Sequence, residues 1–159
     1  MKASPYLIFN GNCKDAINIY EKAFKSKAVI SHYKDAPPSE EKIPQEFADF
    51  VMHATMPLGK SLLYLCDTTP DQKTTFGNGA SICAEFDSIE EIKSAFAILK
   101  KGGEVSCAPG ETFWNKYYAE LKDQFGIKWS LMLECTCTEK CYTGKNPDCT
   151  CKACDCAHK

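Results

Sequence analysis

The sequence contains no arginine, since all 19 of its basic residues are lysine, and its formal charge at pH 7 is only −2. Without arginine there is no planar fork for bidentate contacts with phosphate, and a nearly neutral chain presents no basic surface to a nucleic acid. Long apolar runs are also missing, because even 127–133 is far shorter than the roughly 18 to 20 residues that span a bilayer. The N-terminus has no apolar export segment. We therefore expect a cytoplasmic protein without nucleic-acid or membrane partners.

The residues that are present divide the chain into two parts. Hydrophobic residues make up 44% and charged residues 25% of the 159 positions, a composition typical of a globular domain. Seven of the 11 cysteines, however, follow Glu134, in a segment whose only aromatic residue is Tyr142. So few core-forming side chains cannot offset the entropy of ordering that segment, which therefore needs cross-links from metal or disulfides. We expect a folded domain over 1–134 and a Cys-rich tail over 135–159.

Before this boundary, periodic apolar residues predict the same succession of elements twice. The first succession is a strand over 6–10, a helix that begins after Asn12, and strands over 28–34, 50–56 and 61–66. The second is a strand over 80–86, a helix, and strands over 104–107, 117–122 and 127–133. A repeat of roughly 75 residues indicates an internal duplication. We predict an α+β fold of two βαβββ modules, about 1–68 and 79–134, whose curved sheets surround a small-molecule cleft.

Both predicted helices carry start signals. Asn12 can cap the first helix, for which we predict an apolar face of Ala16, Ile19, Tyr20, Ala23 and Phe24. Ser88 and Glu91 form a capping box at the start of the second helix. Its predicted apolar stripe consists of Ile92, Ala95, Phe96 and Leu99, and the pair Gly102 and Gly103 ends it.

Four segments carry a joint signature. They read YLIFNGNC at 6–13 with the apolar helix residues that follow, HATMPLGKSLLYLCD at 53–67, ETFW at 111–114, and DQFGIKW at 123–129. In this order they resemble the PhnB-like branch of the vicinal oxygen chelate superfamily, which includes glyoxalases, bleomycin resistance proteins and dioxygenases. The resemblance implies paired βαβββ modules and a homodimer. It implies no single reaction, because this fold hosts many, but an enzyme of this kind would be lyase-, isomerase- or dioxygenase-like.

Enzymes of the superfamily generally hold a divalent metal on His, Glu or Gln side chains at fixed strand positions. The resemblance places Pro5, Ser81 and Ser130 at three of these positions and leaves the position on the fourth strand unassigned. Proline has no donor side chain, and serine hydroxyls cannot replace imidazole or carboxylate around a transition metal. We therefore expect the core to lack the glyoxalase metal centre.

Other side chains are candidates for a ligand pocket and for catalysis. Strand alternation puts each of two polar sets on a single face of its strand: Ser81, Cys83 and Glu85, and Ser130, Met132 and Glu134. Trp114 completes the predicted pocket. His53, Glu85 and Glu134 are the candidate catalytic residues, because a buried Glu beside a His can act as general acid and base. The alternative is that His53 is a hydrogen-bonded structural histidine and that Trp114 belongs to the core.

Two chemistries associated with this resemblance lack their usual residues. Some family members are labelled as ubiquinone methyltransferases, but the close pair Gly77 and Gly79 precedes a strand instead of joining a strand to a helix. That is the wrong context for a nucleotide-type cofactor loop. Phosphate or phosphonate chemistry lacks its arginine clamp, although lysines such as Lys128 could partly substitute.

The tail resembles metallothionein-like sequences. Its candidate metal ligands are Cys135, Cys137, Cys141, Cys149, Cys151, Cys154, Cys156 and His158. Closely spaced thiolates can surround soft d10 ions, so we expect zinc or another d10 ion here. The seven cysteines and His158 are enough ligands for two tetrahedral sites without shared sulfurs. Disulfides would need an oxidising compartment, and a reduced tail without metal is the other alternative. We expect the remaining cysteines to be buried small hydrophobes: Cys13, Cys66, Cys83 and Cys107.

Two hypotheses for function follow from these observations. The first is a PhnB-like domain that binds an unidentified small molecule, with or without catalysis, fused to a thiolate metal-binding tail. The second is a non-catalytic protein that sequesters a ligand or metal ions. A closed cavity that holds His53 together with Glu85 or Glu134 would favour an enzyme.

Overall fold

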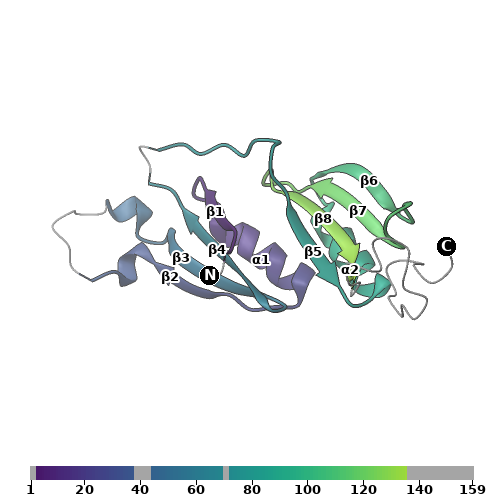
Figure 1. The fold of residues 1–159 in the computed structure, drawn as a ribbon. Helices are drawn as coiled ribbons and strands as arrows, with labels where there is room; N and C mark the ends of the chain where they lie inside the picture. Colours follow the sequence, from purple (N-terminus) through teal and green to yellow (C-terminus); the bar gives the residue numbers. More distant parts are fainter. Residues whose placement is uncertain (1–2, 38–43, 70–71, 136–159) are drawn as a thin grey trace. The chain divides into compact units, whose positions relative to one another are not determined.

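The computed structural model describes residues 3–37, 44–69 and 72–135, and the chain divides after Gly77 into two units. Each unit contains one strand, then one helix, then three further strands (Figure 1). In the described ranges, no helix is long and apolar enough to cross a membrane.

The first unit is a four-stranded sheet with one long helix. Its elements are β1 (Tyr6–Phe9), α1 (Cys13–Phe24), β2 (Val29–His32), β3 (Val51–Leu58) and β4 (Ser61–Asp67), with 3-10 turns at Tyr33–Asp35 and Gln45–Phe47. The strand order is β1-β4-β3-β2. The β1 strand runs parallel to β4, whereas the other neighbours are antiparallel.

The second unit repeats this topology. Its elements are β5 (Ile82–Phe86), α2 (Ile89–Leu99), β6 (Glu104–Gly110), β7 (Tyr118–Lys122) and β8 (Lys128–Leu133), in the order β5-β8-β7-β6. The same backbone hydrogen bond closes both parallel pairs: Thr68 N–H donates to Phe9 O at 2.7 Å, and Glu134 N–H donates to Phe86 O at 2.8 Å. The predicted α+β fold of two βαβββ modules is therefore confirmed.

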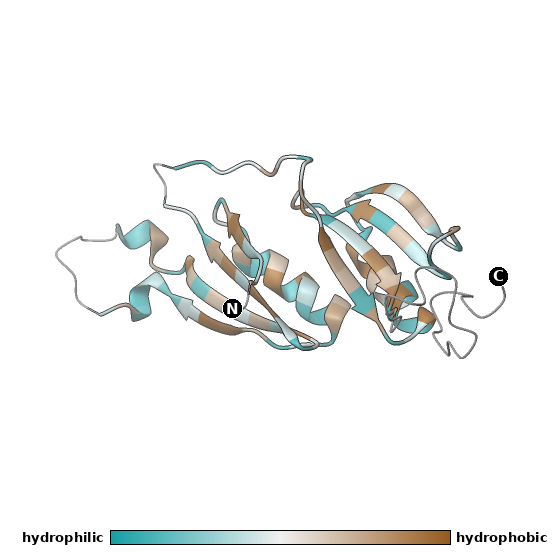
Figure 2. Ribbon diagram, viewed as in Figure 1, coloured by the Kyte–Doolittle hydropathy of each residue, from teal (hydrophilic) through white to brown (hydrophobic). Residues whose placement is uncertain are grey.

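Each helix buries one face against its own sheet. The buried stripe of α2 is the predicted one, Ile92, Ala95, Phe96 and Leu99. The stripe of α1 is shifted from the prediction and consists of Cys13, Ala16, Ile17, Tyr20 and Ala23. Ile19 and Phe24 are only half-buried, because they flank this stripe instead of forming its centre. Figure 2 shows hydrophobic and hydrophilic residues alternating along the helices and strands, as expected when one face of each is covered.

A buried carboxylate organises the first unit. Asp67, at the end of β4, is only 3% exposed. Its Oδ1 accepts from Gly11 N–H at 2.9 Å and Cys13 N–H at 3.0 Å, and its Oδ2 accepts from Val51 N–H at 2.9 Å. Burial raises the pKa of this carboxyl, and the three N–H donors oppose that shift. One side chain thus joins the start of α1, the start of β3 and the end of β4.

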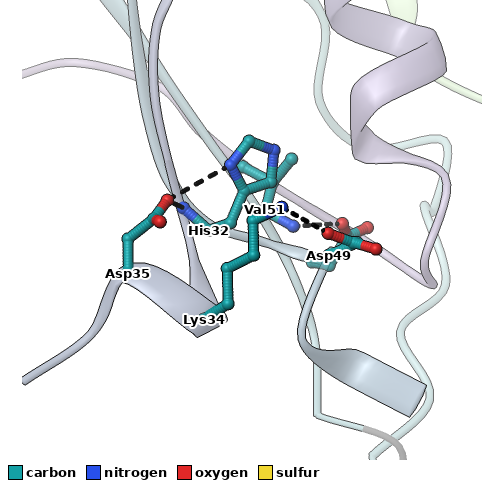
Figure 3. A network of polar contacts seen from close by, with 6 residues as sticks. His32, Lys34, Asp35, Asp49 and Val51 are labelled. Atoms are coloured by element: carbon teal, nitrogen blue, oxygen red, sulfur yellow. Dashed lines mark hydrogen bonds and ion pairs between the residues drawn. The ribbon is translucent and has the colours of Figure 1, made fainter. Parts of the chain in front are cut away.

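These contacts correct the predicted helix cap. In the described part of the chain, the Asn12 side chain makes no capping hydrogen bond to α1, because Asp67 reaches the helix start from another strand. Figure 3 shows Val51 at the start of β3, beside the pairs Lys34–Asp49 and His32–Asp35. For the second helix the Ser88 half of the predicted capping box is confirmed, since Ser88 Oγ accepts from Glu91 N–H at 3.3 Å.

We predict that Asp67→Asn destabilises the protein by about 1 to 3 kcal/mol, because the amide NH₂ would face a buried backbone N–H that now has a carboxylate acceptor. Urea unfolding of the full chain should show a lower midpoint. The matched control is Asp49→Asn, which removes an exposed carboxylate whose partner is Lys34. We expect no measurable shift for that control, and equal shifts for the two variants would contradict the role given to Asp67.

Candidate functional site

Most of the predicted pocket residues lie on the face of the second sheet opposite α2, which we call the uncovered face because no described helix of this unit packs on it. Helix α2 covers the other face, where Leu121, Trp129 and Leu131 are fully buried. Residues that alternate with these point away from the helix. The strand register sets two rows side by side on the uncovered face: Cys83, Ser130 and Glu120, and Glu85, Met132 and Tyr118. Their role in binding stays a prediction, but their shared face is a property of the fold.

A hydrogen-bonded network runs across this face. The Tyr118 hydroxyl donates to Glu120 Oε2 at 2.9 Å and lies 3.3 Å from Ser130 Oγ. Ser130 Oγ is in turn 3.4 Å from Ser81 Oγ. On the other side, Lys128 Nζ pairs with Glu120 Oε1 at 3.2 Å. The hydroxyls of Ser81, Ser130 and Tyr118 therefore form a chain of contacts that ends at a carboxylate. That carboxylate belongs to Glu120, and Lys128 balances its charge.

The environment keeps this network uncharged at its centre. Burial, together with the neighbouring Glu120, raises the pKa of Tyr118 above its usual value, so the phenol is the form present at neutral pH. The side chains of Glu120 and Lys128 are 22% and 33% exposed, which leaves their ion pair partly shielded from water. Because Lys128 is engaged in this pair, it is a poor substitute for the missing phosphate clamp.

An aromatic ring borders the network. The ring of Trp114 meets that of Tyr118 edge-on, with centroids 4.6 Å apart and planes at 65°. Trp114 is 45% exposed, so its interpretation as a core residue is wrong. Asn115, which is buried, fixes this loop: its Nδ2 donates to Leu133 O at 3.1 Å, and its Oδ1 accepts from Tyr117 N–H at 2.9 Å.

Tyr118 and Glu120 are not among the residues predicted above, although a signal for them exists. Glu120 stands opposite Ser130 in the second sheet, as Thr55 stands opposite Tyr64 in the first. Two positions earlier on the same strands, Tyr118 therefore corresponds to His53. The repeat therefore relates Tyr118 to the candidate residue His53, and this equivalence is the signal for β7.

The three candidate catalytic residues do not share a unit. His53 lies on β3 of the first unit, whereas Glu85 lies on β5 and Glu134 directly follows β8 in the second. His53 is exposed, and its ring contacts those of Tyr6 and Tyr64. Glu85 stands opposite Met132 in the register, and both Glu85 and Glu134 are exposed. Their catalytic role stays a prediction.

The core cysteines differ from one another. Cys13 is fully buried as predicted, and that burial raises the pKa of its thiol. Cys83 is exposed, which makes the prediction wrong for this residue, and Cys66 and Cys107 are only half-buried. These three alternate with residues that face the helices, so they project from the uncovered faces.

The residues at the family's metal positions do not fit a transition metal. The register relates Ser4 to Ser81 and Tyr64 to Ser130. Pro5 is thus the wrong position for the first strand, because it alternates in step with the helix-facing Leu7. Serine and tyrosine hydroxyls are neutral and do not replace the imidazole, carboxylate or thiolate donors of such sites. Within 3–37, 44–69 and 72–135, no three His, Cys, Asp or Glu side chains group as metal ligands.

Most of the predicted tail ligands lie outside the described residues. These are Cys137, Cys141, Cys149, Cys151, Cys154, Cys156 and His158. Cys135 is described and is partly buried, one residue beyond Glu134.

Known proteins share this chain's sequence and fold. It is 30% identical over 139 residues to protein YjdN of Escherichia coli, a match that covers 82% of this chain and 94% of YjdN. The crystal structure of protein PA1353 from Pseudomonas aeruginosa is 31% identical, with a TM-score of 0.74 over 84% of this chain and 98% of that one. A Bacillus cereus PhnB protein is 28% identical, with a TM-score of 0.68 over 84% of this chain and 100% of that one.

A family-wide pattern also matches. The family described as 3-demethylubiquinone-9 3-methyltransferase matches residues 1–132, which is nearly all of the chain before the Cys-rich tail. Together with the duplicated βαβββ units and these relatives, this match shows that the chain belongs to that family, the PhnB-like branch of the glyoxalase fold.

Proposed function

We propose that this protein binds a small, polar organic molecule on the uncovered face of the second sheet, and that its tail binds d10 metal ions. The observation that carries the first part is the network of Ser81, Ser130, Tyr118 and Glu120. Hydroxyls already held in place lose little conformational freedom when a ligand arrives, so they favour binding.

The composition of this face indicates the ligand's chemistry. Its serine hydroxyls can donate to carbonyl or hydroxyl oxygens, while Trp114 and Met132 offer apolar contact. The Lys128–Glu120 pair leaves no unbalanced charge in the network. A neutral, oxygen-bearing ligand with a short apolar part therefore suits the face better than a phosphate. Catalysis is not required by this proposal, so the alternative of a sequestering protein stays within it.

Methyl transfer, which the family description names, has less support in this chain. A nucleotide-type cofactor loop joins a strand to a helix through glycines that let the cofactor approach the backbone. Between β1 and α1 the corresponding glycine is Gly11, with φ of +87°, and a Cβ there would lie 2.8 Å from the ring of Phe50. That turn is already packed by the protein's own side chain. Gly77 and Gly79 precede β5, as the sequence indicates.

We predict that Ser130→Ala weakens the binding of small hydroxy and oxo compounds roughly two- to tenfold, the effect of losing one hydrogen bond. Saturation-transfer NMR with a fragment set of such compounds would identify ligands and rank their affinities. Ser94→Ala is the matched control, because Ser94 is exposed on α2. Fragments that bind the two variants equally well would place binding elsewhere and contradict the proposed site.

We predict that a chain ending at Glu134 binds neither nickel nor zinc stoichiometrically and does not isomerise the methylglyoxal–glutathione hemithioacetal in their presence. The reason is the set of hydroxyls at the metal positions, Ser4, Tyr64, Ser81 and Ser130. Metal analysis after dialysis, with an activity assay, checks this. Stoichiometric metal that is lost on His53→Ala or Glu134→Ala would overturn the prediction.

For the full chain we predict about two or more d10 ions bound through thiolates, because zinc prefers four ligands per ion and the tail supplies seven cysteines and His158. Cadmium titration, followed by thiolate-to-metal absorbance, gives the stoichiometry. Thiols must lose protons to bind, so loading should release protons and acid should release the metal. A variant with Cys149, Cys151, Cys154 and Cys156 changed to serine should bind fewer ions. Equal stoichiometry, or disulfides after anaerobic purification, would refute the tail site.

A further inference from the structure

Three aromatic rings converge on the uncovered face of the first sheet. They belong to Tyr6 on β1, Tyr64 on β4 and His53 on β3. The ring centroids are 6.0 Å apart for Tyr6 and Tyr64, 6.1 Å for Tyr6 and His53, and 5.7 Å for His53 and Tyr64. Strands β1 and β3 are separated by β4, so the Tyr6 and His53 rings lean toward each other above it. Each ring therefore contacts both of the others.

The angles between the rings give this cluster a shape. The planes of His53 and Tyr64 are tilted by only 39°, whereas Tyr6 stands at 70° to His53 and at 72° to Tyr64. The first two rings form a shallow floor and Tyr6 forms a wall beside it. We call these three residues the aromatic corner.

The aromatic corner is accessible from outside its unit. Tyr6 is 51% exposed and His53 is also exposed, while Tyr64 is half-buried. A cluster that served only the core would be expected on the face that α1 covers, where Leu63 and Leu65 are fully buried.

The surroundings of the corner select one kind of guest. The register places no Lys, Asp or Glu in the two rows that contain it, which are Tyr6, Tyr64, Thr55 and Val29, and Ile8, Cys66, His53 and Ser31. A charged ligand would therefore find no opposite charge within these rows. The rings also touch one another, so a cation cannot enter between them as it does in an aromatic cage. What remains is a flat guest that lies on the floor with an edge toward the wall.

The electron density of the three rings further restricts which flat ligand can bind. Phenol rings are electron-rich, and offset stacking is most favourable when the partner ring is electron-poor. The His53 imidazole and the Tyr64 hydroxyl can donate hydrogen bonds to a carbonyl oxygen or ring nitrogen at the edge of such a guest. We infer that the aromatic corner binds a planar, uncharged, electron-poor heteroaromatic ring that carries carbonyl groups. Its residues belong to the first sheet, whereas the function proposed above rests on residues of the second sheet.

Riboflavin is a suitable probe, because its ring system has this chemistry and its fluorescence is quenched when it stacks on tyrosine. We expect saturable quenching with the full-length protein. Tyr64→Leu and Tyr6→Leu should each weaken binding roughly fivefold or more, since both keep apolar volume but remove a stacking ring. Phe113→Ala is the control, because Phe113 is a 94% exposed ring on the second unit. It should leave the affinity unchanged.

Two further measurements keep the result interpretable. Thermal unfolding of each variant would show whether its sheet is intact, and Tyr6→Leu is the milder change because β1 is an edge strand. The imidazole resonances of His53 should shift on titration with riboflavin. The inference is overturned if quenching does not saturate, if folded Tyr6→Leu and Tyr64→Leu proteins bind as the parent does, or if Tyr118→Phe abolishes binding while both leucine variants retain it. Ser130→Ala tests only the site proposed on the second sheet. Whether that variant keeps or loses fragment binding therefore does not decide whether the aromatic corner binds riboflavin.

Discussion

The first unit depends on the burial of one carboxylate. Asp67 receives three backbone N–H groups from two segments that lie far from it in the sequence, the start of α1 and the start of β3. A carboxylate at 3% exposure is tolerable only because these donors replace water. Successive side chains of β4 point alternately toward the helix and away from it. Leu65 and Asp67 face the helix side, and Tyr64 and Cys66 face outward, so a shift in register would exchange the two sets.

The second unit reaches the same topology with other contacts. The register relates Asp67 to Leu133, which is buried and apolar and offers α2 no acceptor. Its helix is capped locally by Ser88 instead. A buried carboxylate reappears at Asp123, which accepts from Phe125 N–H, Ile127 N–H and Trp129 Nε1 and thereby fixes the turn before β8. Asp67 and Asp123 thus stand at different joints of their units, because any of these joints leaves backbone donors that need an acceptor.

Local patterns predicted what depends on local physics. The α2 stripe and the Ser88 cap follow from residues within one or two turns, and the structure has both. The Asn12 cap fails because the competing acceptor, Asp67, comes from a strand that the helix meets only in the folded sheet. The sequence likewise does not indicate that Cys83 is exposed. Alternation groups it with Glu85, but only the placement of α2 decides which group is covered. Trp114 is at the surface because Asn115 fastens its loop to β8, a contact between residues distant in sequence.

The duplicated register explains how one fold can carry two surfaces. Equivalent positions hold Tyr6 and Cys83, Tyr64 and Ser130, and His53 and Tyr118. On the helix-covered faces, most equivalent pairs stay apolar, and Ala54 and Ala119, and Leu65 and Leu131, even keep the same residue type, because packing against a helix limits the change; Asp67 and Leu133 are an exception. The uncovered faces are free of that constraint. One carries aromatic rings with no Lys, Asp or Glu in the two rows around them, and the other is hydroxyl-rich and carries the Lys128–Glu120 pair and Glu85. Ligand chemistry in this fold is therefore set by the outward half of each strand, which topology leaves unspecified.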